Sequence, residues 1–245
     1  AEPRAVVAWG PPNASKAHAV PGGYRVSGEW HFASGCRQAT WMGAHCQVVE
    51  PDGTLRLNAA GKPLVRSLLF PAEHATHIED WNVIGMRGTA SEGYTVTDLF
   101  VPEAFSSTRE EPEQRREPGK LYAFTMQGLY AVGVAGVAFG IARAMLDAFK
   151  QLAMHKTPRN LGRLADSATV QASVARHEAA IGAARAYRGE TLHDLWDDAE
   201  DGVGGSERPT RARVRLACTN GIQAAIAVAA AIAKAAGVSA IFPAT

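Results

Sequence analysis

Apolar and polar positions follow two different rhythms along the chain. In residues 1–103, short runs rich in β-branched and aromatic side chains alternate with clusters of Gly, Pro, Asn and Asp. Such runs have the length and composition of strands, and the breaks between them have the composition of tight turns. The runs lie at 4–10, 24–35, 41–50, 64–71 and 93–102. Short strands at this spacing predict an antiparallel β-barrel or sandwich.

After residue 120 the rhythm becomes helical. Residues 121–156 place apolar side chains at three- and four-residue steps over many turns. A second helical stretch follows Asp166 or Ser167, either of which is a plausible N-cap, and a third begins near Ser206 and ends at Gly237. Long helices joined by short connections predict an antiparallel bundle of three helices. The predicted fold class is therefore α+β.

A polar segment separates the two patterns. Residues 104–120 contain prolines and many charged side chains, which makes them too hydrophilic to be buried and a poor continuous helix. We therefore expect a β-domain at 1–103, a polar linker at 104–120 and a helical bundle at 121–245.

Composition excludes some functions. The 245 residues are 47% hydrophobic and carry a formal net charge of +1, so no global field draws the chain to nucleic acid. The three cysteines are far apart without metal-ligand spacing, which favours free thiols in a reducing cytoplasm. His74 and His77 form an HxxH pattern in a loop-like stretch without a third ligand nearby, so we predict no metal site.

The helical half raises the question of a membrane. Residues 128–142 are uncharged but short for a span, and Arg143, Asp147 and Lys150 follow in helical phase. We therefore predict no membrane association. The third helical stretch is dominated by Ala, so several of its faces allow close approach of a neighbour. An apolar patch of this kind predicts a homo-oligomer, a dimer or tetramer, formed through the bundle.

One strand run changes abruptly from bulky to small side chains. Trp30 and Phe32 are two positions apart, so on a regular strand they share one face and could pack against a flat ring. Backbone N–H groups near Ala33 and Ser34, with the Ser34 hydroxyl, could bond the edge of that ring, and Gly35 leaves room for close approach. The alternative is a core strand that ends in a turn.

Two segments carry a resemblance to a known family. "GGYRVSGEWHFASG" resembles the flavin-binding strand of the acyl-CoA dehydrogenase superfamily, and "WNVIGMRGTASEGYTVTDLFVPE" (81–103) resembles a second segment of its middle β-domain. The three helical stretches resemble its C-terminal bundle. The resemblance implies that the family's N-terminal helical domain and last helix lie outside this sequence.

Within that superfamily, "SGEWHFASGC" and "GMRGTAS" are more similar to the two-component flavin monooxygenases. The dehydrogenases proper usually show Lys, then Trp, then Thr-Asn on this strand, whereas here a hydroxyl remains at Ser34 and the Lys and Asn are missing. The resemblance implies an oxygenase component that uses reduced flavin, FMN or FAD, from a partner flavin reductase. Its substrate would be an aromatic or related small molecule.

The resemblance also assigns cofactor contacts. It implies that Trp30, Phe32, Ala33, Ser34 and Gly35 meet the flavin ring. Outside this run, Arg87 lies between two glycines, which suits contact with an anion or a ring. The alternative for Arg87 is a surface salt bridge of small energetic value, and Ser91 is a weaker candidate.

A second arginine enters only through the family pattern. Arg159 falls where the family often places an Arg that meets the flavin phosphates of a neighbouring subunit, with Lys156 and Arg163 as rivals.

No catalytic residue can be named from the sequence. The dehydrogenases use a Glu near their last helices, but no Asp or Glu follows Glu207. The monooxygenases imply a His or Arg from a final helix that this sequence does not contain. Two alternatives therefore stay open: an acyl-CoA dehydrogenase acting with FAD, and a non-catalytic interaction module.

Overall fold

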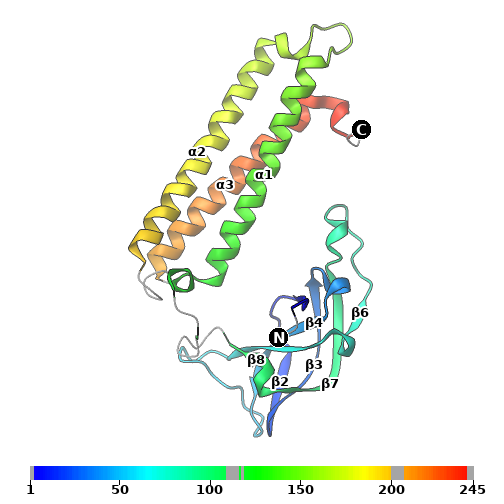
Figure 1. The fold of residues 1–245 in the computed structure, drawn as a ribbon, viewed down its shortest axis with the longest axis vertical. Helices are drawn as coiled ribbons and strands as arrows, with labels where there is room; N and C mark the ends of the chain where they lie inside the picture. The colour runs from blue at the N-terminus through cyan, green and yellow to red at the C-terminus, as the bar shows by residue number, and fades with distance from the viewer. Residues whose placement is uncertain (1–2, 109–115, 117–118, 200–206, 242–245) are drawn as a thin grey trace. The chain divides into compact units, whose positions relative to one another are not determined.

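The computed structural model describes residues 3–108, 116, 119–199 and 207–241. The chain divides into two compact units, Ala1–Arg116 and Glu117–Thr245. Among the described residues, the first unit contains an eight-stranded sheet and the second contains three long helices (Figure 1). The predicted α+β class is confirmed at this level. Most of the predicted linker, at 109–115 and 117–118, lies outside the described residues.

The strands of the first unit form one sheet. Across the sheet the strands follow the order β6, β7, β3, β2, β4, β5 and β8, and β1 lies beside β4. The five predicted runs appear as β1, β3, β4, β5 and β7, whereas β2, β6 and β8 were not expected because they are short or rich in Ala and Ser. The bounds are β1 (Val7–Trp9), β2 (Lys16–Val20), β3 (Gly23–Ala33), β4 (Trp41–Val49), β5 (Val65–Pro71), β6 (Thr76–Ile78), β7 (Glu92–Pro102) and β8 (Ser106–Ser107).

The prediction of a purely antiparallel sheet is wrong for two pairings. β4 runs parallel to β1 and to β2, and the other pairings are antiparallel. The reason is that β4 does not return beside β3. It crosses to the far side of β2, so the reversal that makes it antiparallel to β3 gives it the direction of β2.

The core of the first unit is organised around Trp30. Its indole is fully buried and stacks on Tyr94, with ring centroids 5.4 Å apart. Trp30 Nε1 donates to the carbonyl oxygen of His45 at 3.2 Å, and the Tyr94 hydroxyl donates to that of Gly43. Both polar atoms of the stack are therefore satisfied, which removes the penalty for burying them.

The cysteines are free and buried, as expected. Burial raises the pKa of the Cys46 thiol to about 12. A thiol with that pKa stays protonated at neutral pH and is unreactive.

The first residues of the predicted linker extend the sheet. β8 pairs with β5, and Phe105 stacks on Trp41 with ring centroids 5.4 Å apart. The segment from 104 to 107 therefore packs with the β-unit rather than spanning solvent.

The second unit consists of α1 (Met126–His155), α2 (Ala168–Asp198) and α3 (Arg208–Ala236). α3 packs against both other helices, which touch one another much less (Figure 1). The Thr125 side chain caps α1 by accepting from the Gly128 N–H, and Gly237 ends α3 with a φ of 60°. Both ends follow the usual capping preferences.

Two helical stretches have the length and composition of membrane spans. These are Met126–His155 and Arg208–Ile241, with mean hydropathies of 1.7 and 1.9 over their most apolar windows. Core helices of globular proteins pass the same test. α1 also directs Arg143 and Lys150 to Glu178 of α2, so its charges serve helix packing. The absence of membrane association stays a prediction.

Gly221 gives a test of how closely the helices pack. A Cβ at Gly221 would lie 2.6 Å from Phe139 Cζ, whereas a Cβ at Gly182 of α2 meets nothing within 4 Å. Gly182→Ala should stabilise the protein by about 0.5–1 kcal/mol through helix propensity. Gly221→Ala should instead destabilise it by about 1–3 kcal/mol through overpacking. Urea unfolding of both variants measures the difference, and a stabilised Gly221→Ala variant would contradict this packing.

Candidate functional site

The end of β3 is irregular. Its pairing with β7 shifts register between Trp30 and Ala33, and Phe32 has a left-handed φ of 59°. The side chain of Phe32 is consequently turned outward and is 63% exposed, while Trp30 is 0% exposed. The prediction that these two aromatics share a face is therefore wrong, because a bulge interrupts the alternation of the strand. Trp30 belongs to the core and does not contact a ligand on this surface.

Phe32 is part of an exposed apolar surface. Its ring meets Trp81 edge to face, with centroids 6.1 Å apart, and Trp81 Nε1 donates to the carbonyl oxygen of Met86. Met86 is 76% exposed. We call Phe32, Trp81 and Met86 the Phe32 surface. Exposed aromatic and Met side chains gathered in one place are typical of ligand or interaction sites.

A chain of hydroxyl groups lies beside the Phe32 surface. Ser34 Oγ and Ser91 Oγ are 2.7 Å apart, and Ser91 Oγ is 2.7 Å from Thr89 Oγ1. Thr89 Oγ1 donates in turn to the Met86 carbonyl oxygen. The Gly35 N–H donates to the carbonyl oxygen of Thr89 at 2.8 Å. The two segments singled out in the sequence, far apart along the chain, therefore meet at one place.

Backbone strain gathers at the same place. In the part of the chain that the structure describes, five non-glycine residues have positive φ, and Phe32, Met86 and Ala90 are three of them. Each such residue costs of order 1–3 kcal/mol and persists only where its surroundings impose it. The Cys36 thiol, for example, donates to the carbonyl oxygen of Ala90. Strain concentrated beside an exposed aromatic surface favours a functional role for that surface.

A histidine flanked by two carboxylates positions Trp81. His31 Nδ1 lies 2.8 Å from Asp80 Oδ2, and His31 Nε2 lies 2.7 Å from Glu29 Oε1. Asp80 also accepts a hydrogen bond from the Gly93 N–H of β7. The hydrogen bond with Asp80, reinforced by Glu29, raises the pKa of His31 above its ordinary value. Because Asp80 precedes Trp81, this contact holds the ring partner of Phe32.

Arg37 provides a second attachment for the same segment. Its guanidinium holds both carboxylate oxygens of Glu92 and also donates to Glu79 Oε1 at 3.2 Å. Glu92 is buried, so this bidentate pair is shielded from solvent at its acidic end. Glu79 and Asp80 are thus fixed by one permanent cation and one titratable cation.

Three potential metal ligands lie close together at this site. Ligand atoms of Cys36, His77 and Glu92 fall within 4.8 Å of one another. Both Glu92 oxygens are already bonded to Arg37, and burial is the main cause that raises the pKa of the Cys36 thiol, which disfavours a thiolate ligand. A neighbouring guanidinium also opposes a second cation. The prediction of no metal site stands as a prediction.

Among the remaining predicted contacts, Ala33, Ser34 and Gly35, only Ser34 has a polar side chain. Ala33 is fully buried, and Ser34 is exposed. The Ser34 N–H donates to the Phe32 carbonyl oxygen, and the Gly35 N–H is occupied by Thr89. Of the two expected backbone donors, near Ala33 and Ser34, the Ser34 N–H is therefore already used, and the hydroxyl groups remain as candidate polar contacts.

The alternative role predicted for Arg87 was a surface salt bridge. Arg87 lies in a short 3-10 helix, Arg87–Thr89, and is exposed. Within the described ranges its guanidinium makes no ion pair, so the expected alternative of a surface salt bridge is not observed there. A cation on the loop that carries Thr89 is suited to an anionic or electron-rich ligand.

Lys156 and Arg163, the two alternatives to Arg159, make contacts within the second unit. Lys156 Nζ donates to the Ala236 carbonyl oxygen at 2.7 Å and to Ser239 Oγ, and Arg163 pairs with Asp166 at 2.8 Å. Both are committed to the structure of the bundle. Arg159 is exposed and forms no ion pair with other residues that the structure describes. It remains the candidate for an anion on this unit.

Sequence reasoning missed Trp81, Asp80 and Thr89. Trp81 begins the second family segment, and an aromatic residue shortly before "GMRG" was the available signal. The contacts of Asp80 and Thr89 depend on tertiary register, which no local pattern encodes.

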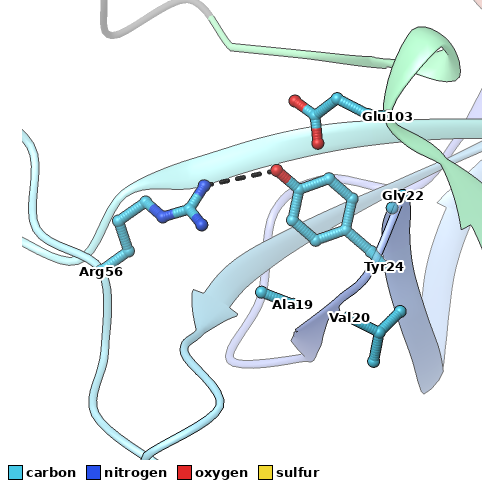
Figure 2. A pocket seen from close by; sticks show the side chains of 7 residues that line it. Ala19, Val20, Gly22, Tyr24, Arg56 and Glu103 are labelled. Carbon is cyan, nitrogen blue, oxygen red and sulfur yellow. Dashed lines mark hydrogen bonds between the residues drawn. The ribbon is translucent and has the colours of Figure 1, made fainter.

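A shallow cavity of about 200 Å³ lies at the other end of β3 (Figure 2). Tyr24 points between Arg56 and Glu103, and its hydroxyl accepts from Arg56 Nη1 at 3.3 Å. Arg56 also pairs with Glu50 at 2.6 Å, and Arg66 pairs with Glu103 at 3.0 Å. Burial, with the Glu103 hydrogen bond, raises the pKa of Tyr24. Because these charges are already paired, we assign this cavity a structural role.

The His31 contacts predict a pH-dependent contribution to stability. A folded-state pKa above the ordinary 6.5 means that the contribution is fully present below pH 6.5 and is lost as pH rises through the folded-state value. The free-energy difference between wild type and His31→Gln should therefore shrink as pH rises above about 6.5. Urea unfolding across that range measures it. Arg37→Gln is the control, because its cost should persist over the same range, and a pH-independent cost of His31→Gln would refute the charged contact.

Comparison with known proteins identifies the fold. Residues 132–245 match the family model described as "Acyl-CoA dehydrogenase, C-terminal domain". The structure of XiaF from Streptomyces sp., in complex with FADH2 and glycerol, superposes with a TM-score of 0.80 at 24% identity, covering 98% of this chain and 61% of that one. At this identity the likeness shows the shared fold.

Curated relatives include a hydroxylase and a monooxygenase. The chain is 30% identical over 181 residues to the oxygenase component of a FADH(2)-dependent resorcinol hydroxylase from Rhizobium sp., covering 69% of this chain and 42% of the relative. It is 27% identical over 223 residues to an indole-3-acetate monooxygenase from Acinetobacter baumannii, covering 90% and 54%. The chain thus spans about half the length of these relatives. The resemblance predicted from the sequence is confirmed at the level of similarity: residues 132–245 match the family model of the acyl-CoA dehydrogenase C-terminal domain, and the relatives are named as a FADH(2)-dependent hydroxylase and a monooxygenase.

Proposed function

We propose that this chain is the flavin-binding part of the oxygenase component of a two-component flavin monooxygenase, acting on an aromatic or related small molecule. The observation that carries the proposal is the meeting of Ser34 with Ser91 beside the exposed Phe32 ring. The names of the relatives, a resorcinol hydroxylase and an indole-3-acetate monooxygenase, support the class of reaction.

The residues fit a flavin ring. A flavin needs an apolar surface, hydrogen-bonding groups at the ring edge and positive charge for its anionic parts. The Phe32 surface supplies the first, the Ser34 and Thr89 hydroxyl groups supply the second, and Arg87 is the candidate for the third. When bound in reduced form, the flavin supplies the activation of dioxygen for transfer of one oxygen atom to the substrate.

The remaining residues of the site position these groups. The bulge turns Phe32 outward, and the contacts of His31 with Asp80 and of Arg37 with Glu79 hold Trp81 against it. Pre-formed side chains of this kind lower the ordering cost of binding. Solved structures of the same fold contain reduced FAD or FMN, so the proposed cofactor is one of these two flavins.

An acyl-CoA dehydrogenase is the less supported alternative. The relatives reported above are named as a resorcinol hydroxylase and an indole-3-acetate monooxygenase, and neither name describes an acyl-CoA dehydrogenase. Tight binding of oxidised flavin would favour that alternative. Binding of neither redox form would favour a non-catalytic interaction module.

Partners and assembly follow the same proposal. A flavin reductase would deliver reduced flavin, and the free cysteines suit a cytoplasmic protein. Exposed apolar side chains at helical spacing support a homo-oligomer, a dimer or tetramer, formed through α1: Tyr130, Val134, Val137 and Ile141. We also infer that the three helices run antiparallel, because short connections join them. The sheet is inferred to curve toward a barrel or sandwich, because two register shifts interrupt the β3–β7 ladder and bulges of this kind increase the twist of a sheet.

The Phe32→Gly variant tests flavin binding at a position where the substitution should not lower the stability of the fold. Gly adopts a left-handed φ without steric cost, so the variant should relieve about 1 kcal/mol of strain while losing little burial. It should therefore unfold at an unchanged or higher urea concentration. Its dissociation constant for reduced FMN or FAD, measured anaerobically by fluorescence, should rise at least tenfold because the ring contact is lost.

Ser34→Ala provides the second measurement and should weaken the same affinity several-fold. Thr97→Val, at an exposed position of β7, is the control and should leave it unchanged. Wild-type affinity in both the Phe32 and Ser34 variants would remove the assignment of this surface to flavin.

A further inference from the structure

Residues 79–90 form a segment between β6 and β7 that carries Trp81, the ring partner of Phe32. Most of these residues are exposed, and in the described structure none of them belongs to a strand. Glu79 and Asp80 lie directly before Trp81, and their side chains contact residues outside the segment. These contacts therefore decide how firmly the Trp81 ring is held against Phe32.

The Asp80 carboxylate lies over Gly93 of β7. The Gly93 N–H donates to Asp80 Oδ1 at 2.8 Å, and His31 Nδ1 lies 2.8 Å from Asp80 Oδ2. A Cβ at Gly93 would lie 2.8 Å from His31 Nδ1 and 3.3 Å from Asp80 Oδ2. The two side chains therefore occupy space that exists because Gly93 has no side chain, which distinguishes this pair from a chance surface contact.

The two contacts of His31 require the protonated ring. Nδ1 faces Asp80 at 2.8 Å, and Nε2 faces Glu29 Oε1 at 2.7 Å. An imidazolium donates from both nitrogens, whereas a neutral imidazole has one N–H and one lone pair. Loss of the proton therefore turns a lone pair toward one carboxylate and removes the charge that strengthens the other contact.

Two charged side chains face the imidazole, Glu29 from its own strand and Asp80 from the segment. From β7, which packs against both, the Gly93 N–H contacts Asp80. The hydrogen bond with Asp80 is the main cause that raises the pKa of His31, and Glu29 adds to it. The charged ring is thus the form that this cluster of groups favours.

Arg37 provides the constant part of the attachment. Its guanidinium donates to Glu79 Oε1 at 3.2 Å and also holds the Glu92 carboxylate. Arginine stays protonated in proteins, so this contact does not change with pH. His31 is therefore the attachment whose strength depends on pH.

We propose that His31 is a pH-dependent positioning residue for the flavin site: its imidazolium holds the segment that carries Trp81, so affinity for reduced flavin falls when His31 loses its proton. The inference rests on the proposed binding of flavin at the Phe32 surface. The contribution of His31 should be fully present below pH 6.5, its ordinary pKa, and should be lost as pH rises through the higher pKa of the folded protein.

The experiment measures the dissociation constants of reduced FMN and reduced FAD, anaerobically by fluorescence, from about pH 5.5 to about pH 9, which brackets the titration of histidine. Ionisation of the flavin affects wild type and His31→Gln alike, so the ratio of their dissociation constants isolates His31. This ratio should change about fivefold or more over the range. Wild type should bind more tightly at low pH, and the two proteins should approach the same affinity at high pH.

Two matched variants separate an effect of the imidazolium from a merely structural role. Glu29→Gln keeps the Asp80 contact but removes one carboxylate from His31, so the decline in affinity should begin at a lower pH. Glu79→Gln removes a neighbouring carboxylate that contacts Arg37 instead, so the midpoint should stay that of wild type. Circular dichroism and urea unfolding establish that each variant is folded.

A second readout does not depend on flavin. Trypsin cleavage after the exposed Arg87 reports release of the segment, and cleavage after the exposed Arg159 in the second unit is the internal reference. The rate at Arg87 relative to Arg159 should rise with pH in wild type. In His31→Gln it should be high at every pH.

The two readouts distinguish failure of the proposal from failure of the proposed function. If flavin binds but the ratio of wild type to His31→Gln does not change with pH, or Glu29→Gln leaves the midpoint in place, the proposal is overturned and the proposed function stands. If wild type binds reduced flavin at no pH, the proposed function fails. The trypsin measurement then decides the role of His31 in holding the segment, and a cleavage ratio that does not change with pH overturns it.

Discussion

The burial of Trp30 is the constraint on which the candidate site depends. Its indole stacks on Tyr94 and donates to the His45 carbonyl oxygen, so β3 is fixed in depth and register at this residue. Beyond it, the ladder with β7 slips, and the chain must accommodate an extra residue before Ala33 is buried again. Phe32 is the residue left over, and its left-handed backbone is the result. The exposed ring is therefore a consequence of two buried anchors on either side of it.

The sequence predicted the elements well and the site only in part. Long apolar periodicity located the three helices, and alternating runs located the longer strands, because these patterns are local. Ser34 and Ser91 were both singled out, and the structure brings them into contact. The prediction that Trp30 and Phe32 share a face was wrong, because the bulge depends on pairing with β7, which is distant in the sequence. Asp80 was missed for the same reason, because its contacts with His31 and Gly93 depend on tertiary register.

The charges around the site divide into structural and available groups. Arg37, Arg56, Lys156 and Arg163 are each paired with carboxylates or carbonyl oxygens. Arg87 and Arg159, which the sequence had favoured, remain without ion pairs among the residues that the structure describes. An unpaired guanidinium is hydrated until a ligand binds. An anion can therefore bind there without the breaking of an existing ion pair.

The parallel pairing of β1 with β4 has a consequence for folding. β1 cannot complete its ladder until β3 has formed and the chain has crossed to place β4, so its contacts are among the less local in the sheet. Non-local parallel pairings form late, because the intervening loop must be closed first. Val7 and Trp9 are carried by this strand. β1 therefore docks only after β4 has been placed, so the edge-to-face contact of Trp9 with His45 forms no earlier than the β1–β4 ladder.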